Sequence, residues 1–432
     1  MKKISKILSI PILRCFFILM NLSMCTVFDG YTLVTNQSAS QQVFITELID
    51  NEYNIINSWE SPCRTASMAY LLPDSTLVYP CKQENIVLSN IAASGGRILK
   101  YDWDGNVLWD WSCPENYQLH HDIEPLQNGN ILAIAAEQIA DNIRPDVVLE
   151  ISPLGTNDAE IVWDWHAWDH RGSNNPYKFD ENVPYNKNDW NHFNSIHLNN
   201  DGDKIYLSSR TWSEFYVIGY GGDSDILYRW GNPQNYGRGD VQDQVLDANH
   251  GVNEVSVGSP GENNIIIFNN RTSVTGGSNP FSSVIEIVPP MDENGDYYIA
   301  EGEPFGPQEI YWEYGDGSFY ANKQSGAFRL QNGNTIVIDA DSALIFEVTN
   351  DGEVVWEYQG TGSQINRAQK YSLNYLSILG DLNNDNNVNI LDVVQLVNYV
   401  LNSSPYDSLL DINVDGQINI LDIVSIINII LS

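Results

Sequence analysis

The sequence predicts an all-β protein, a six-bladed β-propeller, followed by a small α-helical unit at its carboxyl end. One observation is a unit that returns from about residue 30 to 370: an apolar strand, a turn containing Asp or Gly, and a strand ending in Trp. A second is the extra strand pair between copies, with its own turn, as in 126–132 and 330–336. A third is an abrupt change of composition after Leu379.

The repeated unit occurs six times by direct count. The copies start at apolar strands 44–48, 98–101, 147–151, 215–218, 284–288 and 344–348 and end at Trp59, Trp111, Trp165, Trp230, Trp312 and Trp356. Two strand pairs per unit make a four-stranded antiparallel sheet, and six such sheets indicate radial repetition, with a two-sheet sandwich as the alternative. The first copy lacks its leading strand pair, so we expect residues 367–371 to supply part of it and close the ring.

Residues 1–28 have the features of a secretory signal peptide, because three lysines near the start precede a mostly apolar run. The stretch 22–25 also resembles a lipoprotein cleavage box, although Met24 is bulky for the position before the cysteine. No other stretch is long and apolar enough to span a bilayer. We therefore expect a secreted or periplasmic protein with its propeller at residues 29–375.

The charge balance limits the possible partners. With 56 acidic and 21 basic residues, the formal net charge is -35 at pH 7. Such a chain repels the phosphates of nucleic acids and anionic membrane surfaces, so we expect neither as a partner.

Three cysteines remain after removal of the signal peptide: Cys63, Cys81 and Cys113. An odd number in an exported chain allows one disulfide and one free thiol. Cys63 and Cys113 follow Trp-containing strands at similar positions, which favours their pairing, and three free buried thiols are the alternative.

The polar residues at the start of each leading strand predict a functional cavity. The leading strand lies nearest the central channel, so its first residues face a shared space. All seven histidines fall between 120 and 250, and four of them open leading strands, which packing alone would not produce. These starting positions hold Arg64, Thr65, His120, His121, His192, His250, Ser325 and Arg367.

One strand pair shows the expected geometry most directly. His192 opens the strand that runs to residue 197, and Arg210 closes the strand that starts at 205, after a polar turn. In an antiparallel pair these two ends lie side by side. A surface histidine and a solvated strand end are the alternative for this pair alone. His166 and His170 fall on a strand end and the loop after it, so we expect them at the rim.

Ordered motifs along residues 30–371 resemble the arylsulfotransferase family, propeller enzymes that move sulfuryl groups between phenols without a nucleotide-sulfate donor. The matching stretches are 119–123 with 128–132, 189–196 with 208–210, 227–233, 267–271 and 325–330. The resemblance implies that His120 or His121, His192, Arg210 and His250 carry the chemistry and that His250 becomes transiently sulfated. This chain has Gly251 where the family commonly has Asp or Asn.

Such residues suit sulfuryl transfer. Arg210 and a protonated histidine can donate charge-assisted hydrogen bonds to sulfate oxygens, and a neutral imidazole can attack sulfur. A second histidine can exchange a proton with the phenolic oxygen, so an aryl sulfate donor and a phenol acceptor require no metal or other catalytic cofactor. Two alternatives stay open. One is a zinc site at 120–122, which lacks the usual ligand spacing; the other is a propeller that binds sulfated or phenolic ligands without turnover.

The tail contains one motif twice. Oxygen-bearing side chains occupy positions one, three, five, nine and twelve of two loops, as in a calcium loop, and apolar helices follow at 393–401 and 423–431. Asp at position twelve and no helix before the loop resemble type I dockerin. The resemblance implies that residues 380–432 bind Ca²⁺ and a cohesin-type partner; a solvated Asp/Asn-rich linker is the alternative. The expected ligands are Asp381, Asn383, Asp385, Asn389, Asp392, Asp411, Asn413, Asp415, Asn419 and Asp422.

Overall fold

The computed structural model describes residues 26–38, 42–140, 143–173, 175–180, 189–222, 224–271, 280–315, 317–376, 380–383, 388–402, 410–413 and 417–431. Residues 1–25, which contain most of the expected signal peptide and the lipoprotein-like box, lie outside this set. No helix among the described residues is long and apolar enough to cross a membrane.

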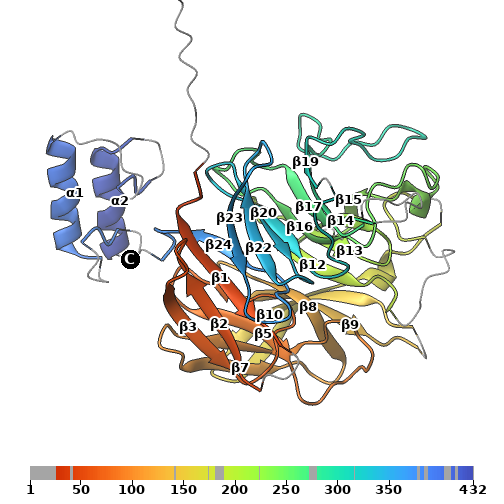
Figure 1. Ribbon diagram of the computed structural model, residues 1–432, viewed down its shortest axis with the longest axis horizontal. Coiled ribbons are helices and arrows are strands. Elements are labelled where there is room, and N and C mark those ends of the chain that lie inside the picture. The colour runs from red at the N-terminus through yellow and green to blue at the C-terminus, as the bar shows by residue number, and fades with distance from the viewer. Residues whose placement is uncertain are drawn as a thin grey trace, which may run out of the picture.

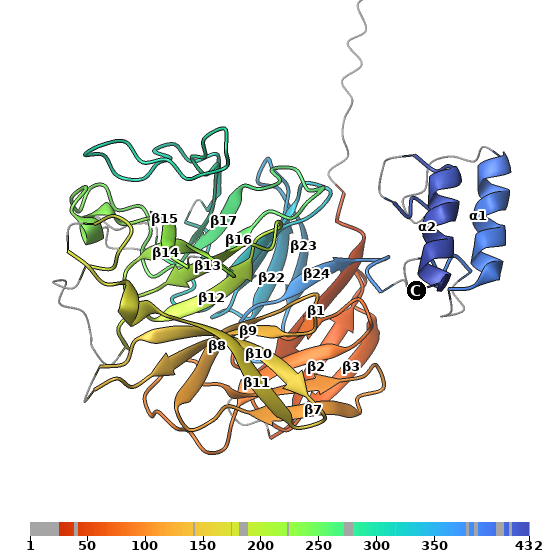
Figure 2. The ribbon, with the colours of Figure 1, turned by 180° about the vertical axis from the view of Figure 1, so that it is seen from behind.

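Six four-stranded antiparallel sheets surround a common centre, which confirms the six-bladed propeller (Figures 1 and 2). Blade 1 consists, from the centre outwards, of β24 (Gln369–Ser372), β1 (Gly30–Asn36), β2 (Phe44–Ile49) and β3 (Ile55–Ser61). Blade 2 consists of β4 (Tyr70–Leu71), β5 (Leu77–Lys82), β6 (Gly96–Tyr101) and β7 (Val107–Ser112). Blade 3 consists of β8 (Tyr117–Pro125), β9 (Ile131–Glu137), β10 (Asp146–Leu154) and β11 (Asp158–His166).

The other three blades follow in chain order. Blade 4 consists of β12 (Phe193–Leu198), β13 (Lys204–Ser209), β14 (Glu214–Gly219) and β15 (Ile226–Trp230). Blade 5 consists of β16 (His250–Glu254), β17 (Ile265–Asn269), β18 (Ser283–Ile287) and β19 (Trp312–Tyr314). Blade 6 consists of β20 (Gly326–Arg329), β21 (Thr335–Asp339), β22 (Leu344–Val348) and β23 (Val354–Gln359). Two short 3₁₀ helices, η1 (Ala167–His170) and η3 (Pro233–Tyr236), lie in the connecting loops.

The core lies between neighbouring blades. The middle strands β14, β17 and β21 are buried along their whole length, because each sheet is covered on both faces. The outer strand β11 is largely exposed and alternates between more and less accessible residues. Apolar runs therefore occur in the second and third strands of a blade, and alternating patterns occur in the fourth.

The repeated tryptophans join each blade to the next. In every blade one outer-strand indole N–H donates to a backbone carbonyl in the outer hairpin of the following blade, at distances from 2.6 to 3.0 Å. The donor in blade 2 is Trp109. Trp111, the tryptophan that ends this unit in the sequence pattern, stacks on Trp109 with ring centroids 5.9 Å apart. The donors are Trp59, Trp109, Trp165, Trp230, Trp312 and Trp356.

The last propeller strand closes the ring. As the sequence predicts, the segment after Arg367 forms the innermost strand β24, which pairs with β1 in blade 1. Lys370 on this strand binds the Glu347 carboxylate of blade 6 at 2.7 Å, and both side chains are buried. The amino- and carboxyl-terminal parts of the propeller thus share one sheet, which leaves no open blade edge at the join.

The predicted disulfide Cys63–Cys113 is wrong, because Cys63 bonds Cys81, with Cα atoms 5.7 Å apart, and Cys113 is a buried free thiol. The segment after Cys63 runs alongside β5, with Thr65 paired to Cys81. Cys63 and Cys113 hold equivalent positions in neighbouring blades, so one blade step separates them.

The tail contains two helices, α1 (Ile390–Asn402) and α2 (Ile420–Leu431), which pack together (Figure 1). Their shared core comprises Val393, Leu396, Leu410, Ile412, Ile423 and Ile426. Each helix begins three residues earlier than the sequence pattern predicts, at position ten of its loop.

The closing ion pair should be important for stability. We expect Lys370→Ala to lower the free energy of unfolding by about 3 kcal/mol or more, because Glu347 is left as a buried charge without its cation. Lys178→Ala is the control: Lys178 pairs at 3.2 Å with Asp225, which is exposed, so its loss should cost less than about 1 kcal/mol. Urea unfolding measures both values, and similar losses in the two variants would contradict the expectation.

Candidate active site

The inner strands of blades 3, 4 and 5 start with irregular pairing, and the channel histidines lie there. The register shifts between Leu119 and Ile123 and again at the start of β12 and of β16. His121 and His192 have positive φ angles of 54° and 52°. Bulged residues of this kind leave the regular ladder and turn their side chains in a new direction. The backbone itself therefore aims these imidazoles into the channel.

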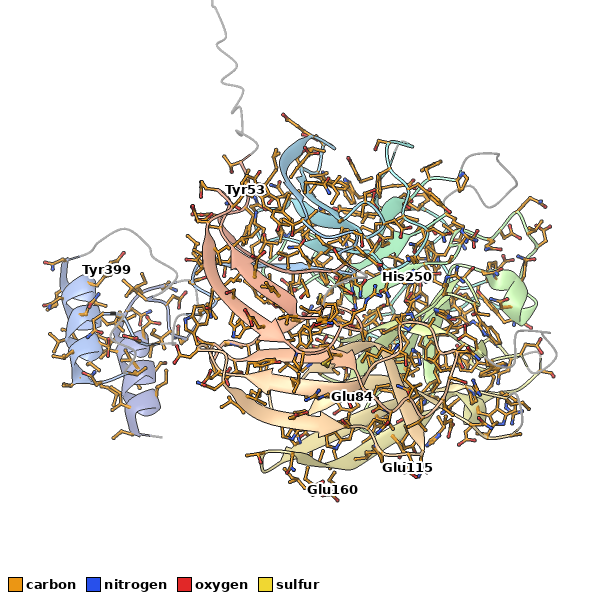
Figure 3. The ribbon with its side chains drawn as sticks, turned by 60° about the horizontal axis from the view of Figure 1, so that its bottom comes forward. Tyr53, Glu84, Glu115, Glu160, His250 and Tyr399 are labelled. Carbon is orange, nitrogen blue, oxygen red and sulfur yellow. A yellow bond between two sulfur atoms is a disulfide. The ribbon has the colours of Figure 1, made fainter. Side chains whose placement is uncertain are left out.

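A cavity of about 590 Å³ opens at this end of the channel. Among the described residues, its lining includes four basic residues and no Asp or Glu, although the chain carries 56 acidic residues. Figure 3 shows His250 in the interior of the propeller, among the blades. The basic and imidazole side chains of the lining are Arg64, Lys82, His121, His192, Arg210, His250 and Lys323.

Most of the residues predicted from the sequence meet in this cavity. The imidazole centroid of His121 lies 4.8 Å from that of His192 and 6.5 Å from that of His250. The backbone N–H of Arg210 donates to the carbonyl of His192 at 3.1 Å, so the two strand ends lie side by side as expected. His120 is buried behind His121 and does not line the cavity.

The other predicted channel positions divide into two groups. Arg64 and Thr65 line the cavity, whereas Ser325 and Arg367 do not. Arg367 lies deeper and binds the Asp122 carboxylate, which also accepts hydrogen bonds from the Tyr70 hydroxyl and from a backbone N–H of β12. The described residues include no group of three possible metal ligands, so they offer no support for a zinc site at 120–122.

The surroundings of His250 fix its tautomer. Its Nδ1 lies 2.7 Å from Oδ1 of Asn270 and 3.0 Å from the carbonyl of Ala248. The Asn270 amide nitrogen donates to two backbone carbonyls, so its oxygen faces the ring. Both neighbours of Nδ1 are therefore acceptors, Nδ1 carries the proton, and Nε2 keeps a free electron pair.

His250 is also held neutral. Burial is the main cause, and the nearby positive charges of His192 and Arg210 add to it, so the pKa of His250 falls to about 3. A neutral imidazole with a free Nε2 has the electronic form of a nucleophile. It is not a proton donor at neutral pH.

The backbone around position 251 explains why this chain has glycine there. Its φ is +61°, and an added Cβ would lie 2.8 Å from the Cα of Gly326 in the next blade. Such a contact excludes Asp or Asn at this position without movement of the backbone. Asn270 binds the ring of His250, which is the orienting role that a side chain at 251 could have had.

His121 ends a buried line of hydrogen bonds. Its Nδ1 lies 2.8 Å from Nδ1 of His120, and Nε2 of His120 lies 3.1 Å from the Asp146 carboxylate. The carboxylate accepts the Nε2 proton of His120, so Nδ1 of His120 accepts the Nδ1 proton of His121. Nε2 of His121 is left unprotonated, and burial together with the neighbouring imidazoles and Arg367 lowers the pKa of His121 well below its usual value.

His192 has a different partner. Its Nδ1 lies 2.6 Å from the carboxylate of Asp189. Burial would raise the pKa of Asp189, but the hydrogen bond from His192 and the positive charge of Arg210 keep it below the usual value. Asp189 is thus an anion that stabilises positive charge on the His192 ring. Of the three cavity histidines, His192 is the one paired directly with a carboxylate.

The Arg210 side chain has open hydrogen-bonding capacity. It lines the cavity beside His192, and within the described part of the chain its guanidinium makes no hydrogen bond or ion pair. A half-buried guanidinium of this kind suits the oxygens of a sulfate group.

The comparisons with known proteins agree with this geometry. The family model described as Arylsulfotransferase (ASST) matches residues 81–377, which is more than half of the chain. The chain belongs to the arylsulfotransferase family. The model for the dockerin type I domain matches residues 379–431 of this arylsulfotransferase-family protein. No curated protein matches the chain.

Three of the solved structures that match this arylsulfotransferase-family chain are distantly similar to it. One is a protein of unknown function from Bacteroides caccae, with 12% identity and a TM-score of 0.44, covering 79% of this chain and 98% of that one. Another is a putative 6-phosphogluconolactonase from Bacteroides fragilis, with 9% identity and a TM-score of 0.42, covering 80% and 98%. A third is virginiamycin B lyase from Staphylococcus aureus, with 12% identity and a TM-score of 0.36, covering 76% and 84%.

His166 and His170 lie outside the cavity of the arylsulfotransferase-family propeller, as expected for rim residues. The hydrogen bond to Glu137, with a contribution from Asp164, raises the pKa of His166 to about 9. His170 stacks on Trp165 with ring centroids 4.6 Å apart.

Several residues of the site were not predicted from the sequence. Asn270 and Asp189 occur within the quoted motifs, but nothing in the sequence indicates that they contact histidines. Asp146 starts a buried strand, and a carboxylate at such a position is the one available signal. Lys82 and Lys323 reach the cavity from outside the inner strands.

The dockerin-type tail has a donor set that fits calcium. Asp392 is buried and accepts three backbone hydrogen bonds from both ends of the first loop, and Asp422 is buried at the same position of the second loop. Asp381 and Asp411 are also buried, while Asp385 and Asp415 lie outside the described residues. Residues 371–432 contain no Lys, Arg or His, so the charged side chains of the tail are all acidic. Buried carboxylates in this situation suit an oxygen-coordinated divalent cation.

The tautomer of His250 can be checked by nuclear magnetic resonance of ¹⁵N-histidine-labelled protein. Because the pKa is about 3, the ring should stay neutral, with the proton on Nδ1, from pH about 8 down to about 5. His166 is the internal control and should be an imidazolium at neutral pH, since its pKa is about 9. Titration of the His250 signal near the ordinary histidine pKa would contradict the assignment.

Proposed function

We propose that the propeller is a secreted aryl-sulfate sulfotransferase that moves a sulfuryl group from a phenolic sulfate ester to a phenolic acceptor through sulfated His250. The observation that carries the proposal is the neutral, buried His250 imidazole, whose free Nε2 lies in a cavity that the described part of the chain lines with basic and no acidic side chains. Membership of the arylsulfotransferase family supports the reaction class.

In the first half-reaction, the donor sulfate lies between Arg210 and His250. Nε2 of His250 attacks sulfur, the bond from sulfur to the aryl oxygen breaks, and its electron pair goes to the phenolic oxygen. His192, hydrogen-bonded through Nδ1 to Asp189, gives its Nε2 proton to that oxygen. The charge that spreads over the sulfuryl oxygens is stabilised by the Arg210 guanidinium. The sulfated ring keeps its proton on Nδ1, which donates it in a hydrogen bond to Oδ1 of Asn270.

In the second half-reaction, the acceptor phenol replaces the first phenol. Neutral His192 removes the hydroxyl proton, the phenolic oxygen attacks sulfur, and the bond between Nε2 of His250 and sulfur breaks. His121 borders both rings, and its unprotonated Nε2 is a hydrogen-bond acceptor beside them. His120 and Asp146 hold the His121 ring in this orientation. Each half-reaction returns the proton that the other one uses.

The second candidate function is a propeller that binds sulfated or phenolic ligands without turnover. The basic cavity favours anion binding in either case, so the two functions differ only in whether His250 forms a covalent bond.

For the tail, we propose a calcium-loaded docking module that anchors the enzyme to a cohesin-type partner outside the cell. The dockerin match supports this role. The same apolar dipeptide, Ile-Leu, is exposed at the start of both helices, with Ile390 65% and Ile420 64% accessible. Exposed apolar side chains repeated on one small module indicate a protein-binding surface.

The proposed reaction predicts a covalent adduct. Brief incubation with a chromogenic aryl sulfate should add one sulfuryl group to the peptide containing His250, and a phenol acceptor should remove it. His250→Ala should abolish both adduct and turnover, since the variant lacks the nucleophile. Arg210→Lys should slow transfer on the order of a hundredfold, because a point charge lacks the planar fork that binds two oxygens.

His197→Gln is the matched control, because His197 lies outside the cavity. Mass spectrometry locates the adduct and absorbance follows the released phenol. Equal turnover by His250→Ala would contradict the mechanism, and a folded parent protein that binds the aryl sulfate without forming an adduct would favour the non-catalytic function.

The tail should depend on calcium while the propeller does not. In the full chain, we expect amide hydrogens of α1 and α2 to be protected from exchange with calcium and to exchange rapidly after chelation, since binding energy and folding energy are coupled in such loops. Peptides from β9 and β14 are the internal control and should exchange equally slowly in both conditions. Identical exchange of the two helices with and without chelator would contradict the calcium-binding role.

A further inference from the structure

The cavity contains a second positive centre that the proposed reaction does not use. Arg64 and Lys82 both line it: Lys82 ends β5 of blade 2, and Arg64 lies ahead of β4 in the segment that runs alongside β5. His250 starts the inner strand of blade 5, and Arg210 follows β13 of blade 4. In a ring of six blades, blade 2 lies opposite blade 5. The second centre therefore faces the nucleophile from the far side of the cavity.

The two cations are held next to each other by the backbone. Thr65 pairs with Cys81, so Arg64 and Lys82 are direct cross-strand neighbours, and the N–H of Lys82 donates to the carbonyl of Arg64 at 2.9 Å. Cys63 and Cys81, the residues immediately before Arg64 and Lys82, are joined by the disulfide. Like charges directly opposite each other on paired strands are unfavourable. The fold thus maintains a pair of positive charges that a bound anion would stabilise.

No carboxylate neutralises this pair among the described residues. Nε of Arg64 donates to the amide oxygen of Gln37 at 2.7 Å, and Nη2 lies 3.4 Å from the amide oxygen of Gln364. These neutral acceptors orient the guanidinium without cancelling its charge, and other N–H groups of the fork stay available. The Lys82 ammonium makes no hydrogen bond or ion pair with any residue that the structure describes.

We propose that Arg64 and Lys82 form a second anion subsite, and that the preferred substrates are phenols and their sulfate esters with a second acidic group remote from the reacting oxygen. This inference rests on the proposed function. A sulfuryl group between Arg210 and His250 directs the aromatic body across the cavity. A carboxylate or sulfonate at the far end of that body then meets Arg64 and Lys82, and a cavity of about 590 Å³ has room for such a molecule.

The test compares two acceptors that differ in one charge, 3-(4-hydroxyphenyl)propionate and its neutral amide, with one chromogenic aryl sulfate as donor. The parent protein should use the carboxylate with a kcat/KM at least tenfold higher than the amide, because charge-assisted hydrogen bonds are stronger than neutral ones. In the double variant Arg64→Gln, Lys82→Gln, this advantage should fall to about twofold or less, mainly through a higher KM. A 4-hydroxybenzenesulfonate arm shows whether the subsite accepts a sulfonate as well as a carboxylate.

Lys100→Gln, also in blade 2 but outside the cavity and paired with Asp74, is the control and should keep the parent preference. The absence of a carboxylate preference in the parent, or its survival in the double variant, would overturn the subsite. Calorimetric titration of the carboxylate acceptor into both proteins gives a readout that needs no turnover. At least tenfold weaker binding to the double variant supports the subsite even if the sulfotransferase proposal fails, and equal binding refutes it.

Discussion

The site depends on the irregular starts of the inner strands. A regular strand would alternate its side chains between the two faces of the blade, and both faces are covered by neighbouring blades. The bulges in β8, β12 and β16 break this alternation and turn the histidines towards the channel. Positive φ angles at His121 and His192 cost about 1–3 kcal/mol each. Contacts between blades offset that cost: Asp146 of blade 3 accepts the N–H of Phe193 at 2.6 Å. The geometry of the candidate site therefore requires a closed ring, which the tryptophan hydrogen bonds and β24 provide.

The charge in the cavity is opposite in sign to the net charge of the chain. An excess of 35 negative charges should repel an anionic substrate at long range, but solution ions screen that field within about 10 Å. Inside the cavity the local charge is positive, and the carboxylates of Asp146 and Asp189 lie behind the imidazoles, outside the lining. Their negative charge acts on the histidine rings without meeting the substrate. Basic side chains thus form the surface of the cavity, and acidic side chains behind the imidazoles control where the protons lie.

The sequence predicts those features that follow from repetition. Six strand-and-tryptophan units determine the number of blades, and the missing leading strand of the first unit indicates closure by the last segment. Repeat position also selects His120, His121, His192 and His250 from seven histidines, and all of these except His120 line the cavity. Contacts between segments cannot be read in this way: the disulfide joins Cys63 to Cys81 because two neighbouring backbones run antiparallel, and Asn270 reaches His250 from the end of β17. Gly251 is the clearest case that the sequence could not explain, because glycine is required there by the close backbone of the next blade.

Three identical imidazoles around one cavity receive different chemical states from the group at Nδ1. His250 donates to a neutral amide oxygen, which does not compensate the charge of a second proton, so the ring stays neutral. His192 donates to the Asp189 carboxylate, which stabilises the imidazolium and suits a proton donor. His121 donates to another imidazole, and only His120 connects it to a carboxylate, so it stays neutral as well. Sulfuryl transfer needs a neutral nucleophile and a charged acid within a few ångströms of each other, and these would exchange their proton if their surroundings were alike. The different Nδ1 partners prevent that exchange, because moving the proton from His192 to His250 would separate it from Asp189 and place it in a buried site that has no anion.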